Sequence, residues 1–181
     1  IKWTEKKEYY RMMLILVSFL GIQSILIFEK KQRESTNEII VFNNNKASIL
    51  AKRLDDSLTV YSSKDVLEDN YIIKSYLIGA GLKNKLKYKI SNNLYRFNNE
   101  TILVVDSLGI YNFNTIKPSV ILLQQSPKIN LERLLKIHQP RIIIADASNY
   151  KSYLENWERT CFKNKIPFYN TMQKGAFILK E

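Results

Sequence analysis

Residues 119–150 read SVILLQQSPKINLERLLKIHQPRIIIADASNY and hold two short apolar runs on either side of an amphipathic segment. The runs, 119–123 and 141–145, are almost continuously apolar, which is typical of central strands buried on both faces. Between them, Asn130 can cap a helix that ends before Pro140, because a proline disfavours helical conformation in the residue that precedes it. The segment therefore predicts a β-α-β unit with its two strands in the middle of a sheet.

The residues after this unit continue the alternation of helix and strand. Residues 150–164 predict a second helix with one apolar face. Residues 166–169 and 176–179 predict closing strands, and Lys174-Gly175 predicts a hairpin turn before the last of them. The back of the chain is thus expected to be β-α-β-α-β.

The residues before the unit predict a mostly antiparallel β region with one helix. Asp65 can cap that helix, which is expected over residues 65–78 and is ended by residues 79–81, Gly-Ala-Gly. In residues 85–90, lysines alternate strictly with apolar residues, which is the pattern of a half-buried strand. The remaining strands of this region are expected at residues 38–42, 47–53, 58–61, 94–97 and 101–105.

The first 29 residues predict a membrane-spanning helix with its flanks. Residues 12–28 read MMLILVSFLGIQSILIF and carry no charge, which is the short end of the length that crosses a bilayer. A signal peptide would be followed by small residues at a cleavage site, whereas a charged linker, residues 30–36, follows here. Residues 37–181 are long enough for one soluble domain.

The chain begins with Ile1 rather than methionine, so we expect it to be a piece of a longer protein, cut just before the last helix of a larger membrane region. Four basic residues precede the span and three follow it. This slightly favours the cytoplasm for the preceding side. The soluble domain is then expected on the periplasmic side of a bacterial inner membrane.

The composition excludes several classes of protein. There are 28 Lys and Arg against 17 Asp and Glu, a net charge of +11. Frequent Lys, Ile, Asn and Tyr together are typical of an AT-rich genome, so the charge alone is weak support for nucleic-acid binding. The single cysteine, Cys161, excludes an internal disulfide framework and is expected to be a buried thiol. The single histidine, His138, excludes most zinc-hydrolase designs, which use two or three histidines.

Lysines on one strand face are the best candidates for contact with nucleic acid. Lys83, Lys85, Lys87 and Lys89 have alternating spacing, so their like charges lie side by side and repel. A DNA strand would supply phosphates and release counterions, which gives affinity without sequence preference. A solvated face that protects the sheet edge explains the same pattern equally well. Lys174 is a further candidate for DNA contact.

Asp106, Asp146 and His138 are weak candidates for a metal site, which would require them to converge. Nothing in the sequence requires this. Asp146, together with Ser148 and Asn149, stands just before the second helix and is expected to cap it. The sequence shows no nucleophile arrangement and no Gly-rich phosphate loop, so we expect no cofactor and no catalytic residue.

Several strings in the tail are specific in order and spacing. They are SPK at 126–128, DASNYK at 146–151, W-x-x-x-C at 157–161, KIPFY at 165–169 and QKGAF at 173–177. Together they resemble the C-terminal domain of the ComEC-family competence proteins, in the form found in Bacteroidetes-type bacteria. That family contains the inner-membrane channel that takes transforming DNA into the cell. The motif residues that we single out are Asp146, Ser148, Asn149, Trp157 and Gly175.

In many ComEC relatives this domain has a metallo-β-lactamase-like fold, with metal ligands in an H-x-H-x-D-H motif. The order of elements here resembles a reduced copy of that fold, but the motif is absent. The resemblance therefore implies an α/β (α+β) fold class, with a transmembrane helix followed by a reduced metallo-β-lactamase-like domain of mixed sheet with flanking helices. It implies no metal and no other cofactor.

The resemblance also implies a function and partners. We expect a non-catalytic module that guides or supports incoming DNA in a competence channel. Its expected partners are DNA, mainly single-stranded and bound without sequence preference, the membrane and the remaining transmembrane part of the channel, with a homo-oligomer as a further possibility. Two alternatives stay open: a metal-dependent nuclease that degrades the non-transported strand, and a purely architectural domain that stabilises the channel.

Overall fold

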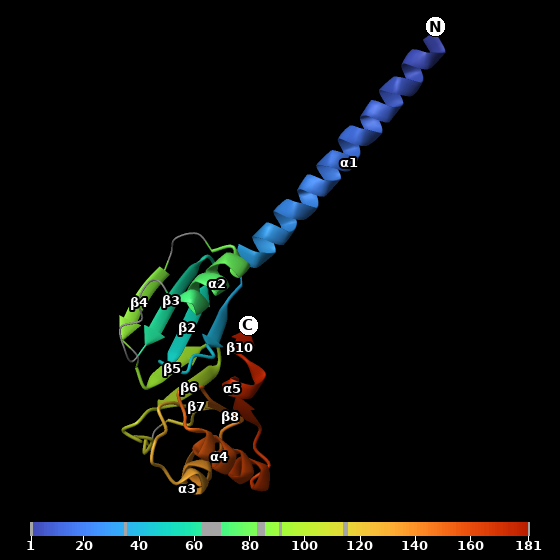
Figure 1. Ribbon diagram of the computed structural model, residues 1–181. Helices are drawn as coiled ribbons and strands as arrows, with labels where there is room; N and C mark the ends of the chain where they lie inside the picture. Colours follow the sequence, from blue (N-terminus) through green and yellow to red (C-terminus); the bar gives the residue numbers. More distant parts are fainter. Residues whose placement is uncertain are drawn as a thin grey trace.

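A long helix, α1 (Lys2–Glu34), stands away from a domain of stacked sheets and helices (Figure 1). The computed structural model describes residues 2–34, 36–62, 70–82, 86–90, 92–113 and 116–180. Within α1, residues 8–31 contain an 18-residue window with a mean hydropathy of 2.1, and the side chains of residues 8–31 are all exposed. At 1.5 Å per residue, a stretch of this length reaches about 36 Å, enough to cross a bilayer core of about 30 Å. The helix is therefore long and apolar enough to be a membrane span, as the sequence predicts.

Two five-stranded sheets form the centre of the domain. The first sheet has the order β10 (Phe177–Lys180), β1 (Glu38–Val41), β2 (Ile49–Leu54), β3 (Ser57–Ser62) and β4 (Leu86–Ile90). The second sheet has the order β5 (Leu94–Phe97), β6 (Glu100–Val105), β7 (Val120–Leu123), β8 (Ile142–Ala145) and β9 (Phe168–Asn170). Both sheets are mixed: β3 and β4 are parallel, as are β6 to β9, while the other pairs are antiparallel.

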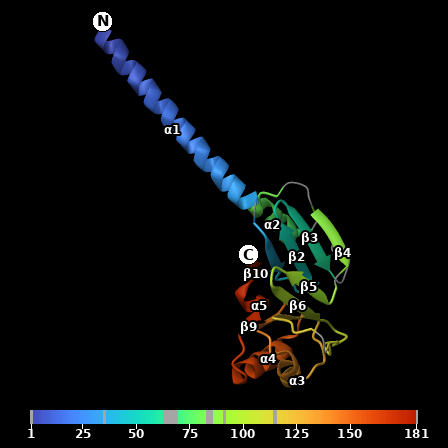
Figure 2. The same cartoon turned by 180° about the vertical axis from the view of Figure 1, so that it is seen from behind.

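The domain has four layers, because each sheet is covered by helix on its outer face and by the other sheet on its inner face (Figures 1 and 2). Helix α2 (Tyr71–Ala80) covers the first sheet, and α3 (Leu131–His138) and α4 (Lys151–Lys163) cover the second. A short helix, α5 (Thr171–Lys174), connects β9 to β10. Buried side chains pack in each of the three interfaces between layers. Examples are Val60 and Ile73 between α2 and the first sheet, Leu50 and Leu122 between the two sheets, and Leu123, Leu134 and Trp157 between the second sheet and helices α3 and α4.

The predicted β-α-β unit is confirmed. All four residues of β7 are buried, as expected of a central strand, and Asn130 caps α3 by accepting a hydrogen bond from the backbone N of Arg133 at 3.0 Å. The alternation in β4 is also confirmed, with Lys87 and Lys89 exposed and Tyr88 turned to the α2 side. The mixed α/β class with flanking helices is therefore the one that the sequence predicts.

Two local predictions are wrong. Helix α2 begins at Tyr71, where Asn70 is the N-cap and accepts from the backbone N of Ile72, so the predicted helix from Asp65 is corrected; residues 63–69 lie outside the described part of the chain. The segment at Lys174 and Gly175 is not a hairpin turn, because β9 and β10 belong to different sheets. Gly175, with a φ of 80°, ends α5 and lets the chain cross between the sheets.

Candidate functional site

The carboxyl ends of β6 to β9 meet at one edge of the second sheet, because these strands are parallel. This edge is where ligands commonly bind on parallel sheets. Polar residues follow each strand here: Asp106 after β6, Gln124 after β7, Asp146 after β8 and Asn170 at the end of β9. Gln124, Asp146 and Asn170 are almost completely buried. The sheet thus collects polar groups at a place where apolar packing would be the rule.

Asp146 is the most unusual of these groups. Its side chain is 1% exposed, and its Oδ1 accepts from the backbone N of Ser148 at 3.1 Å, from Ser148 Oγ at 2.5 Å and from Asn149 Nδ2 at 3.1 Å. Its Oδ2 has no hydrogen-bond partner among the described residues. Burial raises the pKa of Asp146 to about 6, although the hydrogen bonds from Ser148 act in the opposite direction.

Asn149 and Ser148 join the loop after β8 to the loop after β7. Asn149 Nδ2 donates to the backbone O of Leu123 at 2.7 Å, and its Oδ1 accepts from the backbone N of Ser126 at 2.8 Å. Ser148 Oγ accepts from the backbone N of Gln125 at 2.8 Å. The two side chains therefore accept from the backbone N–H groups of Gln125 and Ser126 in the loop after β7, and Asn149 adds a second donor to the Leu123 O, which also accepts from the backbone N of Asp146 at 3.2 Å.

Ser48 brings the first sheet into the same network. It stands just before β2, and its Oγ donates to Ser148 Oγ at 3.0 Å across a separation of 100 residues in sequence. The network therefore spans both sheets at one edge of the sandwich. We call it the polar cluster; its members are Ser48, Gln125, Ser126, Asp146, Ser148 and Asn149.

The loop after β7 has a strained backbone. Gln125 has a φ of 58° and Ser126 a φ of 52°, two consecutive non-glycine residues in the left-handed region. Each such residue costs about 1–2 kcal/mol. Ser126 Oγ in turn accepts from the backbone N of Tyr150 at 2.7 Å, and Tyr150, the N-cap of α4, makes no side-chain cap of its own. Strain of this kind is often kept at functional sites.

These contacts correct the role predicted for the tail motif. Asp146, Ser148 and Asn149 were expected to cap the second helix, but they bond to each other and to the loop after β7. The backbone N–H of Tyr150, the N-cap of that helix, is satisfied by Ser126, which sequence reasoning missed. A capping interpretation looks only at neighbours in sequence, whereas these partners lie 23 to 26 residues away.

A hollow of about 270 Å³, which we call the edge hollow, opens over the polar cluster. Tyr150 stands at its rim with 70% of its surface exposed. Apart from Tyr150, the residues that line the edge hollow are Asn45, Lys46, Ala47, Ser48, Gln125, Ser126 and Ser148. Its lining therefore combines hydroxyl and amide groups with one amine and one exposed aromatic ring.

The residues that were weak candidates for a metal do not form a ligand set. Asp106 Oδ1 accepts from the backbone N of Leu108 at 3.0 Å and so forms a turn. His138 is buried at the end of α3, with its Nε2 2.6 Å from the backbone O of Tyr111. Within the described ranges no three His, Cys, Asp or Glu side chains come together, and Asp146 is the one carboxylate of the polar cluster. The side chains at this edge therefore do not fit a catalytic metal centre.

The candidate lysines are only partly placed. Lys87 and Lys89, which we call the lysine edge, are exposed on β4, the outermost strand of the first sheet; Lys83 and Lys85 lie outside the described residues. Lys174 is separated from the lysine edge, because it precedes β10 at the opposite border of that sheet. Its amine lies 5.5 Å from the centre of the Tyr169 ring.

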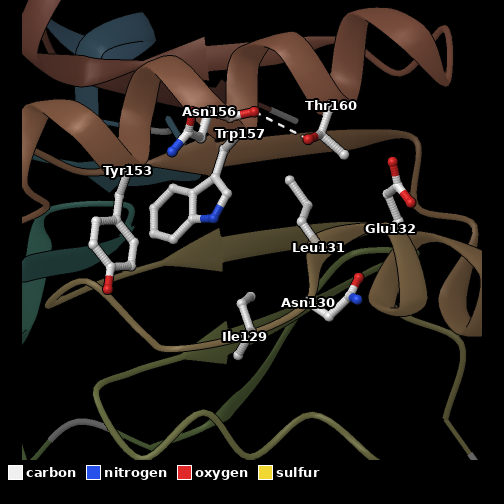
Figure 3. Close-up of a pocket in the computed structure, with 8 residues that line it drawn as sticks. All are labelled: Ile129, Asn130, Leu131, Glu132, Tyr153, Asn156, Trp157 and Thr160. Carbon is white, nitrogen blue, oxygen red and sulfur yellow. Dashed lines mark hydrogen bonds between the residues drawn. The ribbon is translucent and has the colours of Figure 1, made fainter.

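A second hollow, of about 330 Å³, lies between α3 and α4 (Figure 3). Tyr153 and Trp157 project into it from α4, and their rings pack edge to face with their centres 5.4 Å apart. Trp157 is 5% exposed, and Cys161, one turn further along, is fully buried, as predicted for this thiol. Burial raises the pKa of Cys161 to about 12. The W-x-x-x-C motif therefore packs the core and contributes no reactive group.

The comparisons with known proteins bear on the soluble domain. The sequence model of the ComEC C-terminal domain matches residues 39–181, which include the strands of both sheets except for Glu38, the first residue of β1. No curated protein and no solved structure matches the chain. The matched region contains the tail motif, all members of the polar cluster and the lysine edge. The chain therefore belongs to the ComEC C-terminal domain family, which has a role in DNA uptake during competence and is associated with the membrane.

Proposed function

We propose that the domain is a non-catalytic module that guides or supports DNA on the outer side of the inner membrane, held there by α1. The proposal includes the reduced metallo-β-lactamase-like fold, which the order of layers, helix, sheet, sheet and helix, supports. Family membership supplies the link to DNA uptake. The observation that supports contact with DNA is the pair of exposed lysines at the lysine edge.

The lysine edge lies on the inner face of the first sheet, the face that the second sheet packs against, but Lys87 and Lys89 on β4 are exposed. In the parallel register of β3 and β4, Lys87 is opposite Thr59 and Lys89 is opposite Tyr61. Tyr61 packs against Tyr95 of β5 with ring centres 4.8 Å apart, so the border of the second sheet lies over β3 and β4 extends beyond it. Both amines are thus presented to solvent beside the sandwich.

A further amine continues this basic surface inward. Lys52 of β2 is opposite Thr59 of β3, which is itself opposite Lys87, so the two lysines share one face of the sheet. The Lys52 amine lies 5.9 Å from the centre of the Phe97 ring and 3.4 Å from the backbone O of Arg96. Like charges arranged in this way favour a bound polyanion, because phosphates relieve their repulsion.

We propose that the domain is not catalytic because of the kinds of side chain in the polar cluster. Its single carboxylate, Asp146, is buried and surrounded by hydroxyl and amide groups. Metal-dependent cleavage of a phosphodiester needs several ligands around a positioned metal. We therefore assign the cluster a role in holding the two sheets together and in shaping the edge hollow.

Binding of the full chain in detergent micelles to labelled single-stranded DNA tests the proposal. We expect binding at about 50 mM salt that weakens steeply as salt rises. Replacing Lys87 and Lys89 by Gln should lower the slope of log affinity against log salt by about 1.4, since each phosphate contact contributes about 0.7 for a single strand. The matched control replaces Lys136 and Lys163, exposed on α3 and α4, by Gln.

The outcomes separate the alternatives. Equal slopes for the two double variants would remove the lysine edge from DNA contact. Failure of the unmodified chain to bind DNA would leave the architectural role. Degradation of DNA in Mg²⁺ or Mn²⁺ that disappears on Asp146→Ala would establish the nuclease instead.

A further inference from the structure

Tyr150 is an exposed aromatic residue on a fixed backbone. Tyr150 is 70% exposed, although its backbone N is bonded to Ser126 Oγ at 2.7 Å and it is the N-cap of α4. Its ring also lies 6.2 Å from that of Tyr153, centre to centre. An aromatic side chain held in this way presents a flat apolar surface to solvent with little further loss of entropy on binding.

The edge hollow beside Tyr150 has the chemistry of a site for a flat, polar anion. Its lining residues include Asn45, Lys46, Ser48, Gln125, Ser126 and Ser148, whose side chains carry amides, hydroxyls and one amine. Lys46 is exposed, and its backbone N is bonded to Asn44 Oδ1 at 2.9 Å, so its loop is itself structured. The ring, the amides and the amine correspond to the base, the base edge and the phosphate of one nucleotide.

The floor of the edge hollow is maintained at an energetic cost. The buried Asp146 accepts a hydrogen bond from Ser148 Oγ, which in turn accepts from the backbone N of Gln125 and from Ser48 Oγ. Asp146 Oδ2 has no hydrogen-bond partner in the described part of the chain, and Gln125 and Ser126 adopt left-handed backbone conformations. An uncompensated carboxyl oxygen and a strained loop at the same edge favour a binding site over simple packing.

We propose that the edge hollow binds one nucleotide of single-stranded DNA, with its base stacked on Tyr150 and its phosphate paired with Lys46. This rests on the proposed function. The site and the lysine edge lie at the same end of the first sheet, since Ser48 O accepts from Ser62 Oγ at 3.2 Å and Ser62 of β3 is opposite Ile90 of β4. Two strand spacings, about 10 Å, separate β2 from β4, so one strand of DNA reaches both.

The test compares two DNA probes and three protein variants, all as the full chain in detergent micelles. The probes are a labelled oligothymidine and an abasic oligonucleotide of the same length. Tyr150→Leu removes the ring but keeps the backbone N–H, and Tyr150→Phe keeps the ring. Phe162→Leu is the matched control, because Phe162 is an 85% exposed aromatic residue on the same helix.

Tyr150→Leu should weaken binding of oligothymidine about 5- to 150-fold, the range for one stacked base, and leave binding of the abasic probe unchanged. Tyr150→Phe and Phe162→Leu should bind both probes as the unmodified chain does. Oligothymidine that carries 5-iodouracil should crosslink to Tyr150 on irradiation.

Each other result has a defined meaning. If Tyr150→Leu binds oligothymidine normally while Lys87→Gln with Lys89→Gln weakens it, the nucleotide site is wrong and the proposed function stands. If Tyr150→Leu weakens both probes equally, the residue does not stack a base and the inference is overturned. If the unmodified chain binds neither probe, the proposed function fails, and the inference fails with it.

Discussion

Asp146→Asn should remove a pH-dependent loss of stability that the buried carboxylate imposes on the domain. Asn keeps an acceptor oxygen for the donors from Ser148 and Asn149, so the contacts at Oδ1 are preserved. It differs from Asp mainly in having no charged form. Any fixed cost of placing an amide NH₂ where Oδ2 lies is independent of pH, so the change of stability with pH isolates the ionisation.

The magnitude follows from the pKa of Asp146, which burial raises from 3.8 to about 6 in the folded domain. Because the folded pKa is the higher one, ionisation favours the unfolded chain. The contribution of this group to stability is complete below 3.8, is lost as the pH rises from 3.8 to 6, and stays lost above 6. A shift of about two pKa units corresponds to about 3 kcal/mol. The variant should therefore gain about that much over the unmodified chain between about pH 3 and pH 7.

Urea unfolding of the full chain in mild detergent, followed by the fluorescence of Trp157, measures this difference. Trp3→Phe in both proteins removes the signal of the other tryptophan, and the comparison at each pH cancels the titration of other carboxylates. A difference that stays constant from pH 4 to pH 7 would refute the reasoning, because it would mean that Asp146 titrates alike in both states.

Three further predictions concern buried groups. Asn149→Asp should destabilise the domain by about 3 kcal/mol in urea unfolding, because it removes the donations of Nδ2 and places a second acid beside Asp146. Tyr76→Phe should cost about 1–3 kcal/mol by the same measurement, because it leaves the buried Glu38 carboxylate without the Tyr76 hydroxyl. Cys161 should react with iodoacetamide at neutral pH only as urea unfolds the domain, since burial raises its pKa to about 12; rapid labelling of the folded chain would contradict its burial.

The strands and most helices were predictable because their signals are local. The apolar run of β7 and the cap at Asn130 depend on residues that are neighbours in sequence. The division into two sheets was not predictable in this way, because it depends on which faces pack together. Gly175 illustrates this: a glycine with positive φ fits a hairpin turn and a crossing between sheets equally well.

The candidate site was found in part. The sequence singled out Asp146, Ser148 and Asn149, but it assigned them to the nearest helix because Ser48, 100 residues away, gives no local signal. Tyr150 was missed, since nothing in the sequence distinguishes an exposed tyrosine from a buried one. The signal that was available is the recurrence of polar residues after successive parallel strands, whose carboxyl ends must share an edge.

The costs at this edge argue against a purely architectural domain. The carboxylate of Asp146 is only 1% exposed, and Gln125 and Ser126 have left-handed backbone conformations. A domain selected only for rigidity would gain no stability from either feature. If the edge hollow binds a nucleotide, the two costs have one explanation, because both fix the loop that lines the site. Gln125→Gly should then stabilise the domain by about 1 kcal/mol, since glycine adopts positive φ without strain, and should weaken binding of oligothymidine. A variant that gains stability and binds as tightly as the unmodified chain would separate the strain from the site and return the edge to a role in packing.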